Sequence, residues 1–159
     1  MSDIPTTTAV GELGDGFVSG TGNVNGTVMH YVRGGRGPTV VLIHGFSQDW
    51  YEWRRIMPRL AKRFTVVAID LPGIGGSMPS ADGYAAPDLA RDVHQLVDGL
   101  DLGASHLVGH DIGAVSPTRT LASSPNRPGP SRYWRSRFPA SRRSSPWRST
   151  LPCGTSPST

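Results

Sequence analysis

The residues best suited to chemistry form a pentapeptide, Gly109-His110-Asp111-Ile112-Gly113, directly after an apolar stretch. A nucleophilic side chain between two small residues, after a buried strand and before a helix, is the pattern of a nucleophile elbow. The small residues are needed because the turn is tight and the strand and helix approach closely. Serine is the more common nucleophile, whereas the carboxylate of Asp111 suits attack on a saturated carbon with a leaving group. The pattern therefore predicts covalent catalysis.

A second loop, His44-Gly45-Phe46, also follows an apolar stretch, and the periodicity of the chain predicts how the two loops meet. Apolar or alternating runs of strand length are interleaved with stretches of helical periodicity. We expect strands at 27–33, 39–44, 64–70 and 105–110, and helices at 50–62 and 86–100. This alternation predicts an α/β fold with a doubly wound, mostly parallel sheet and right-handed crossovers. Both loops then lie at the carboxyl ends of strands, where functional groups gather.

Two longer strings carry a family resemblance. HGFSQDWYEWRRIMPRLAKRFTVVAIDLPGIGGS begins at His44, and LVGHDIGA ends at Ala114. In order and spacing they resemble the α/β-hydrolases, and most of all the branch of epoxide hydrolases and dehalogenases, in which an aspartate is the nucleophile. The resemblance covers residues 27–114 and implies the N-terminal half of an α/β-hydrolase sheet, which is incomplete. One departure is Ser47, which stands where the branch has proline and would relax the loop without removing its amide donors.

The resemblance implies a role for each candidate site residue. Asp111 would attack an epoxide carbon to give an alkyl ester, which an activated water then hydrolyses to release a diol. The backbone N–H groups of Phe46 and Ile112 would form the oxyanion hole. No cofactor and no metal are expected, and the partner is a small-molecule substrate, an epoxide or an organohalide. The residues expected to shape the site are His44, Gly45, His110 and Trp50.

The residue after the nucleophile separates the members of the branch. By resemblance, haloalkane dehalogenases have tryptophan there to hold the departing halide, and haloacetate-type enzymes have arginine there to bind a carboxylate. Ile112 does neither, and epoxide hydrolase-like proteins tolerate isoleucine at this place. An epoxide is therefore the expected substrate class, with a haloalkane or haloacetate dehalogenase as the alternative.

Each candidate also has a structural interpretation. Asp111 could cap the following helix, because aspartate is a favoured N-cap residue. Trp50 could belong to the core instead of lining a pocket entrance. His44 and His110 fit loop-orienting roles better than metal ligation, since no ligand-like spacing joins them. Asp70 is expected to order its loop. A role on the surface or in packing is expected for His30, His94 and His106.

The charges divide the chain into two parts. Residues 1–114 contain all twelve acidic residues and eight basic ones, for a net charge of −4, whereas residues 115–159 carry +8 and no acid. That tail has 8 Arg, 8 Pro and 11 Ser among its 45 residues. The expected domains are a partial α/β-hydrolase domain, 1–114, and a disordered tail, 115–159. No membrane partner is expected, since no run of about 18 apolar residues exists. No secretory signal is visible, which leaves a cytoplasmic location as the expectation.

The composition of the tail indicates a change of reading frame near residues 114–117. When the codons are shifted by two bases, residues 116–126 can encode V-A-Y-A-Y-A-R-Q-F-P-E, which looks like the helix that follows the elbow in this family. No acid follows Asp111 and no histidine follows His110, so the triad acid and the general base are missing. The chain as written is therefore expected to be truncated, poorly folded and inactive. In the alternative, arginines interleaved with aromatic residues in a genuine tail bind nucleic acid.

Overall fold

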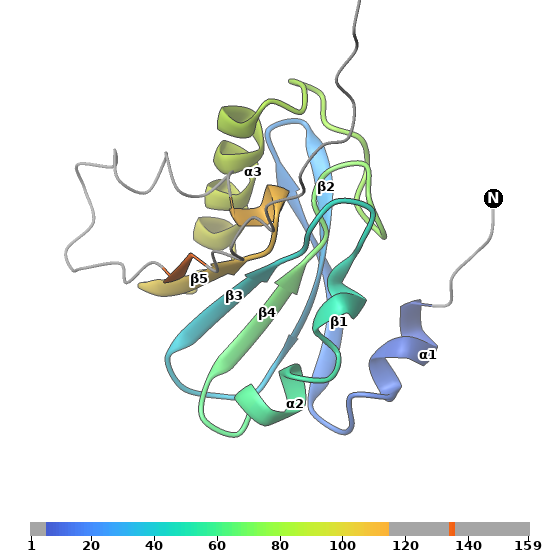
Figure 1. Ribbon diagram of the computed structural model, residues 1–159, viewed down its shortest axis with the longest axis vertical. Helices are drawn as coiled ribbons and strands as arrows, with labels where there is room; N and C mark the ends of the chain where they lie inside the picture. The colour runs from blue at the N-terminus through green and yellow to red at the C-terminus, as the bar shows by residue number, and fades with distance from the viewer. Residues whose placement is uncertain (1–5, 115–133, 136–159) are drawn as a thin grey trace, which may run out of the picture.

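The computed structural model describes residues 6–114 and 134–135, in which helices flank a mixed sheet (Figure 1). The strands follow the order β1-β2-β4-β3-β5-β6 across the sheet. Their bounds are Phe17–Val24 (β1), Thr27–Gly34 (β2), Thr39–Ile43 (β3), Thr65–Ile69 (β4), Ser105–Gly109 (β5) and Trp134–Arg135 (β6). The helices are Thr6–Gly11 (α1), the 3₁₀ helix Trp50–Trp53 (η1), Met57–Leu60 (α2) and Ala86–Gly99 (α3).

The parallel strands β3, β4 and β5 form the centre of the sheet. Every residue of β3 and β4 is buried, because each strand is an apolar run covered on both faces. Helix α3 packs on one face through Val93, Leu96 and Val97. On the opposite face lie η1 and α2, which contribute Trp50 and Met57 to a second core cluster. Helices on both faces of a largely parallel sheet confirm the predicted α/β class, and β1 and β2 add an antiparallel hairpin at one edge.

The order of the strands reverses between β3 and β5. From β3 the chain passes through η1 and α2 to β4 on one side, and then returns through α3 to β5 on the other side of β3. In an open α/β sheet such a reversal leaves a crevice outside the carboxyl ends of the two strands, where ligands bind. The loops that follow β3 and β5 begin at His44 and His110. The topology therefore brings together the two loops that the sequence singles out.

Two elements differ from the prediction for residues 50–62. Instead of one helix, the segment forms η1 and then α2, joined by i→i+3 hydrogen bonds such as Ile56 N to Trp53 O at 2.9 Å. Pro58 explains the break, because it has no N–H for an uninterrupted helix and is tolerated only in a first turn. It occupies the first turn of α2.

Neither β1 nor α1 was predicted from the sequence. Strand β1 reads FVSGTGNV, and only Val24 is buried in it. It pairs on one side alone, so its residues have no need of the apolar run or the strict alternation that marks a central strand. Helix α1 is only six residues long.

The tail contributes one short strand that was not predicted. In β6, Trp134 lies opposite Val108 and Arg135 opposite Gly109, parallel to the end of β5. Apart from residues 134–135, the tail 115–159 lies outside the residues that the structure describes. The predictions that the tail is disordered, or alternatively that it binds nucleic acid, therefore stay predictions. Within residues 6–114 and 134–135, no helix has the length and apolar character needed to cross a membrane.

Candidate active site

Asp111 lies on a sharp turn at the carboxyl end of β5. Its φ is +48°, in the left-handed region, and its side chain is exposed. The turn continues into a helical segment through hydrogen bonds from Gly113 N to His110 O (2.8 Å) and from Ala114 N to Asp111 O (3.0 Å). An N-cap residue is usually extended, and its side chain accepts from the helix that follows. The conformation of Asp111 therefore argues against the capping interpretation.

Gly109 and Gly113 flank the turn at Asp111. They allow it because the backbone of the turn passes very close to the ends of β5 and β3. A Cβ on Gly109 would lie 2.1 Å from Gly113 O, and one on Gly113 would lie 2.5 Å from both Ile43 O and His44 O. Both distances are shorter than any real Cβ contact. The predicted reason for small residues here, close approach of strand and helix, is thus confirmed.

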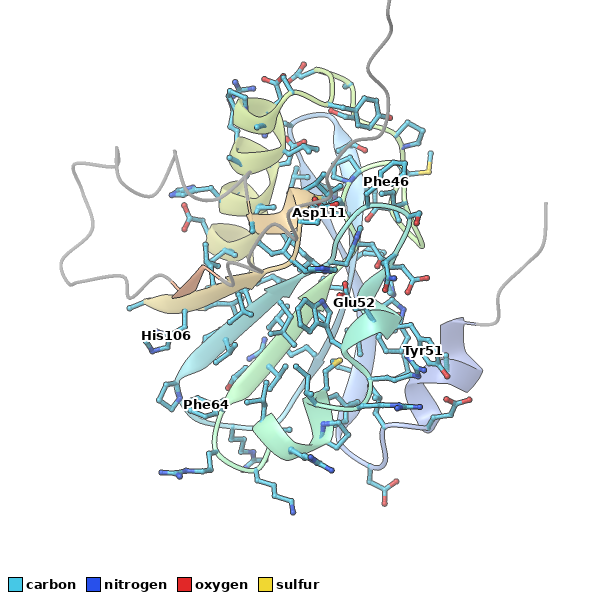
Figure 2. The ribbon with its side chains drawn as sticks, in the orientation of Figure 1. Phe46, Tyr51, Glu52, Phe64, His106 and Asp111 are labelled. Carbon is cyan, nitrogen blue, oxygen red and sulfur yellow. The ribbon has the colours of Figure 1, made fainter. Side chains whose placement is uncertain are left out.

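The loop after β3 points a backbone amide at Asp111. Phe46 N donates to Asp111 Oδ2 at 3.3 Å, while the side chain of Phe46 is 72% exposed. Figure 2 shows Phe46 and Asp111 together at one end of the sheet, with His106 and Phe64 toward the other. Gly45 permits this approach, because a Cβ there would lie 2.8 Å from His110 Nδ1 and 3.2 Å from Asp111 Cβ. Residues 65 positions apart therefore form one site.

Glu52, which sequence reasoning missed, joins the two loops. Its Oε2 accepts from Gly45 N at 3.2 Å, and its Oε1 lies 2.8 Å from His110 Nδ1. One carboxylate on η1 thus holds the amide of the loop after β3 and the side chain next to Asp111. Glu52 lies within the first of the two family strings, but no role was predicted for it there, and only the turn of the chain into η1 brings it to the two loops. Glu52 is therefore a positioning residue of the candidate site.

His44 fixes the loop from beneath. Its side chain is fully buried, and its Nε2 accepts from Leu71 N at 3.0 Å. Because Nε2 is the acceptor, Nδ1 carries the hydrogen and donates to Gly45 O at 2.8 Å. His44 thereby ties the loop after β3 to the loop after β4, as expected of a loop-orienting histidine.

Two candidate residues have side chains that pack in or against the core clusters. Trp50 is 4% exposed and belongs to the cluster beneath η1, so its side chain does not line the entrance to the site. Ile112 is partly buried and packs against the cluster on the α3 face. Its side chain contributes to packing, and the proposed role of Ile112 rests on its backbone amide.

Asp70 orders the loop after β4, as predicted. The buried carboxylate accepts from Trp50 N at 2.7 Å and from Gly76 N at 2.9 Å. His30 was expected on the surface or in packing, and the structure buries it. Its Nδ1 also lies 2.8 Å from Asp70 Oδ2, a partner that was not predicted. Sequence reasoning missed this pair because the two residues are 40 positions apart and meet only when β2 pairs with β4.

Another pair of titratable groups, Tyr51 and Glu12, joins η1 to the residue that follows α1. The Tyr51 hydroxyl donates to Glu12 Oε2 at 2.7 Å, and this hydrogen bond is the main reason that the pKa of Tyr51 is raised above its ordinary value of 10.0. In the part of the chain that the structure describes, no three His, Cys, Asp or Glu side chains group in a way that could hold a metal ion.

Ser47 has a conformation that proline cannot adopt. Its φ is +58°, whereas the proline ring fixes φ near −65°. We expect Ser47→Pro to force the loop after β3 to rebuild and to lower the free energy of unfolding by more than about 1 kcal/mol. Ser47→Gly should raise stability by about 1 kcal/mol, because glycine has no left-handed penalty. Urea unfolding followed by circular dichroism checks both variants, and a Ser47→Pro variant as stable as the wild type would contradict this loop conformation.

Comparison with known proteins identifies the family. The sequence profile described as alpha/beta hydrolase fold matches residues 38–127. The chain belongs to the α/β-hydrolase fold family. Among curated α/β-hydrolase relatives, the soluble epoxide hydrolase of Corynebacterium sp. (strain C12) is 46% identical over 90 residues, covering 57% of this chain and 32% of that protein. The fluoroacetate dehalogenase of Burkholderia sp. is 36% identical over 117 residues, covering 70% and 38%.

Solved structures of α/β-hydrolases agree with this assignment. The epoxide hydrolase CorEH without ligand superposes with a TM-score of 0.61 at 41% identity, over 63% of this chain and 35% of that one. The chain thus spans about a third of the length of the relatives that it matches. The match of the family profile includes both loops of the candidate site and every strand from β3 to β5.

Proposed function

We propose that Asp111 is the nucleophile of a hydrolase that opens epoxides through an alkyl-enzyme ester. One observation carries the proposal: an exposed carboxylate stands on a left-handed turn where the strand order reverses, 3.3 Å from the amide of Phe46. The turn is then a nucleophile elbow. The epoxide hydrolase names of several relatives support the choice of substrate class.

The first step forms an ester and opens the ring. A carboxylate oxygen of Asp111 attacks an epoxide carbon, the ring C–O bond breaks, and the epoxide oxygen takes up a proton from an acid. In the second step, water attacks the carbonyl carbon of the ester, and a base takes its proton. The oxyanion formed on Asp111 would be stabilised by the amides of Phe46 and Ile112, each such donor contributing about 2.7–4 kcal/mol.

We infer that the reaction of this polypeptide stops after the first step, with the alkyl-enzyme ester formed and not hydrolysed. Neither an acid after Asp111 nor a histidine after His110 exists in its 159 residues to activate water. The proposal divides the chain into a partial hydrolase domain, 1–114, and a basic tail, 115–159, read in another frame. Resequencing the coding DNA across codons 105–160 tests this division. If one added or removed base opens a longer reading frame that encodes a downstream Asp and His, the division is supported. If the DNA confirms the present reading frame and shows no such base change, the division is contradicted.

Mass spectrometry of the 159-residue chain after incubation with an aryl epoxide tests the nucleophile. We expect one adduct of the full epoxide mass on the peptide that contains Asp111, and no multiple turnover to diol. An ester adduct is released by hydroxylamine, whereas alkylation of Cys153 gives a thioether that is not. A Cys153→Ser variant removes that background. If the peptide that contains Asp111 carries no adduct, the proposal that Asp111 is the nucleophile is overturned. If the chain produces diol steadily, the inference that it is inactive is overturned.

The alternative substrate is an organohalide, which one relative supports by its name, fluoroacetate dehalogenase. A halide leaves as an anion without needing a proton, so a haloalkane would alkylate Asp111 with release of one halide per chain. We expect the aryl epoxide to react faster, because Ile112 offers neither an indole N–H to a halide nor a cation to a carboxylate. If the haloalkane reacts faster, the epoxide is contradicted as the preferred substrate and a dehalogenase reaction is supported.

A further inference from the structure

A second set of polar side chains, which does not include Asp111, lies on strands β1 and β2 and directly after strand β4. Ser19 Oγ is 2.8 Å from His30 Nε2, and His30 Nδ1 is 2.8 Å from Asp70 Oδ2. A hydroxyl, an imidazole and a carboxylate thus follow one another through two short hydrogen bonds. None of the three belongs to the elbow or to the loop after β3.

The hydrogen bonds around Asp70 fix the tautomer of His30. The carboxylate is fully buried, and both of its oxygens accept backbone N–H groups, from Trp50 and Gly76. Its Oδ2 is therefore an acceptor toward His30 as well, so Nδ1 of the neutral ring carries the hydrogen. The other ring nitrogen, Nε2, must accept a hydrogen bond. Only the hydroxyl of Ser19 lies at that distance among the hydrogen bonds of the described residues.

Packing holds the imidazole in this orientation. His30 is 4% exposed, and Gly76 lies so close that a Cβ there would stand 2.8 Å from His30 Cγ. The hydroxyl of Ser77 accepts from His30 N and donates to Asp70 O, both at 2.8 Å. The imidazole ring of His30, which projects from β2, is thus held against the loop after β4, and its Nε2 faces Ser19.

Ser19 itself is exposed on the edge strand. The two-residue turn Asn25-Gly26 makes Val24 and Thr27 a hydrogen-bonded pair, so the ladder alternates and Ser19 falls opposite Val32 at a non-hydrogen-bonded position. The N–H of Ser19 therefore points away from β2, out from the edge of the sheet. An incoming group at Ser19 Oγ would meet one backbone donor from the same residue.

We propose that Ser19 is a second nucleophile of this chain, with His30 as its general base and Asp70 as the group that orients His30, and that it reacts with acyl and phosphonyl electrophiles. The order of contacts is that of an activated serine, in which a base takes the hydroxyl proton and a third group holds the base. With a single donor for an oxyanion, the site suits activated acyl esters and phosphonyl fluorides.

The reaction with a fluorophosphonate is balanced by the groups present. Ser19 Oγ attacks phosphorus, the Oγ–P bond forms, the P–F bond breaks and fluoride leaves. The hydroxyl proton passes to His30 Nε2, while the Nδ1 hydrogen remains bonded to Asp70. With an aryl ester, an acyl–Oγ bond forms and the aryl oxygen leaves with the proton from His30.

The test uses a fluorophosphonate probe on the 159-residue chain, with intact mass and peptide mapping. We expect one adduct on Ser19, no adduct in Ser19→Ala, and an unchanged rate in the control Thr21→Ala. Thr21 is a matched control because it is an exposed hydroxyl on the same strand, directly opposite His30 in the register. The adduct should also form at the same rate in Asp111→Asn, so this proposal and that for Asp111 fail separately.

The base is tested with His30→Asn, which retains a donor for Asp70 but has no ring nitrogen to accept the proton. We expect the rate at Ser19 to fall by about 100-fold or more. Should this variant lose its circular dichroism signal, the wild-type rate is compared with that of N-acetylserinamide in the same buffer, and the proposal requires an excess of about 100-fold. No adduct on Ser19, an equal rate for the two serines, or an unchanged rate in folded His30→Asn would overturn it.

Discussion

Replacement of Asp111 by asparagine is expected to abolish the ester adduct that an aryl epoxide forms with this chain. A neutral amide has no carboxylate oxygen to attack carbon, and removing the nucleophile of a covalent hydrolase lowers the rate on the order of 10⁶-fold, as in serine proteases. Asparagine keeps a carbonyl oxygen to accept from Phe46 N, and it tolerates the left-handed φ of +48° better than most residues. The adduct on the peptide that contains position 111 is measured by mass spectrometry.

The chain offers a matched control for this substitution. Asp101 is another exposed aspartate in the left-handed region, with a φ of +49°, and it precedes β5 at the opposite end of that strand. Asp101→Asn makes the same chemical change in the same backbone conformation, and its adduct should form at the wild-type rate. Equal loss of the adduct in both variants would show that the effect comes from the fold and would remove Asp111 as the nucleophile.

Replacement of Gly113 by alanine is expected to lower the stability of the chain strongly. The new Cβ would lie 2.5 Å from the carbonyl oxygens of Ile43 and His44, which are backbone atoms at the end of a strand paired on both sides. Those atoms cannot move without disturbing β4 and β5. The loss in the free energy of unfolding should therefore reach or exceed the upper end of the 1–3 kcal/mol typical of overpacking, about 3 kcal/mol. The midpoint of urea unfolding measures it.

Gly99→Ala is the corresponding control. Gly99 ends α3 and has nothing within 4 Å of the position of a new Cβ. Alanine has the higher helix propensity, so this variant should match the wild type or gain up to about 1 kcal/mol. If Gly113→Ala were as stable as Gly99→Ala, the near contact of β3 with the turn after β5 would be contradicted.

The sequence was sufficient to predict the central strands and the candidate nucleophile. The apolar runs that became β3 and β4 are buried at every position, and such runs are readable because both faces of a central parallel strand need apolar side chains. The turn around Asp111 was also predictable, since glycines at 109 and 113 are a local requirement of close backbone approach. Local sequence determines such features, whichever partner the strand later finds.

Other features depended on contacts between distant segments. The burial of Trp50 follows from the packing of η1 on the sheet. The division of residues 50–62 into η1 and α2, by contrast, has a local cause in Pro58, which the helical spacing of the apolar residues concealed. Edge strand β1 lacked an apolar signal because it pairs with a neighbouring strand on one side only. For residues 50–62 the spacing of the apolar residues could not separate the possibilities, because it fits one continuous helix as well as a broken one.

By itself the sequence determined which residues could react and which segments would be buried, because apolar period and glycine spacing are properties of the chain within a few residues. Tertiary structure alone decided which polar groups meet. Glu52 reaches Gly45 and His110 only through the turn into η1, and His30 reaches Asp70 only through the pairing of β2 with β4. Hydrogen bonds need partners within about 3 Å, and residues 40 positions apart come that close only when the sheet has formed.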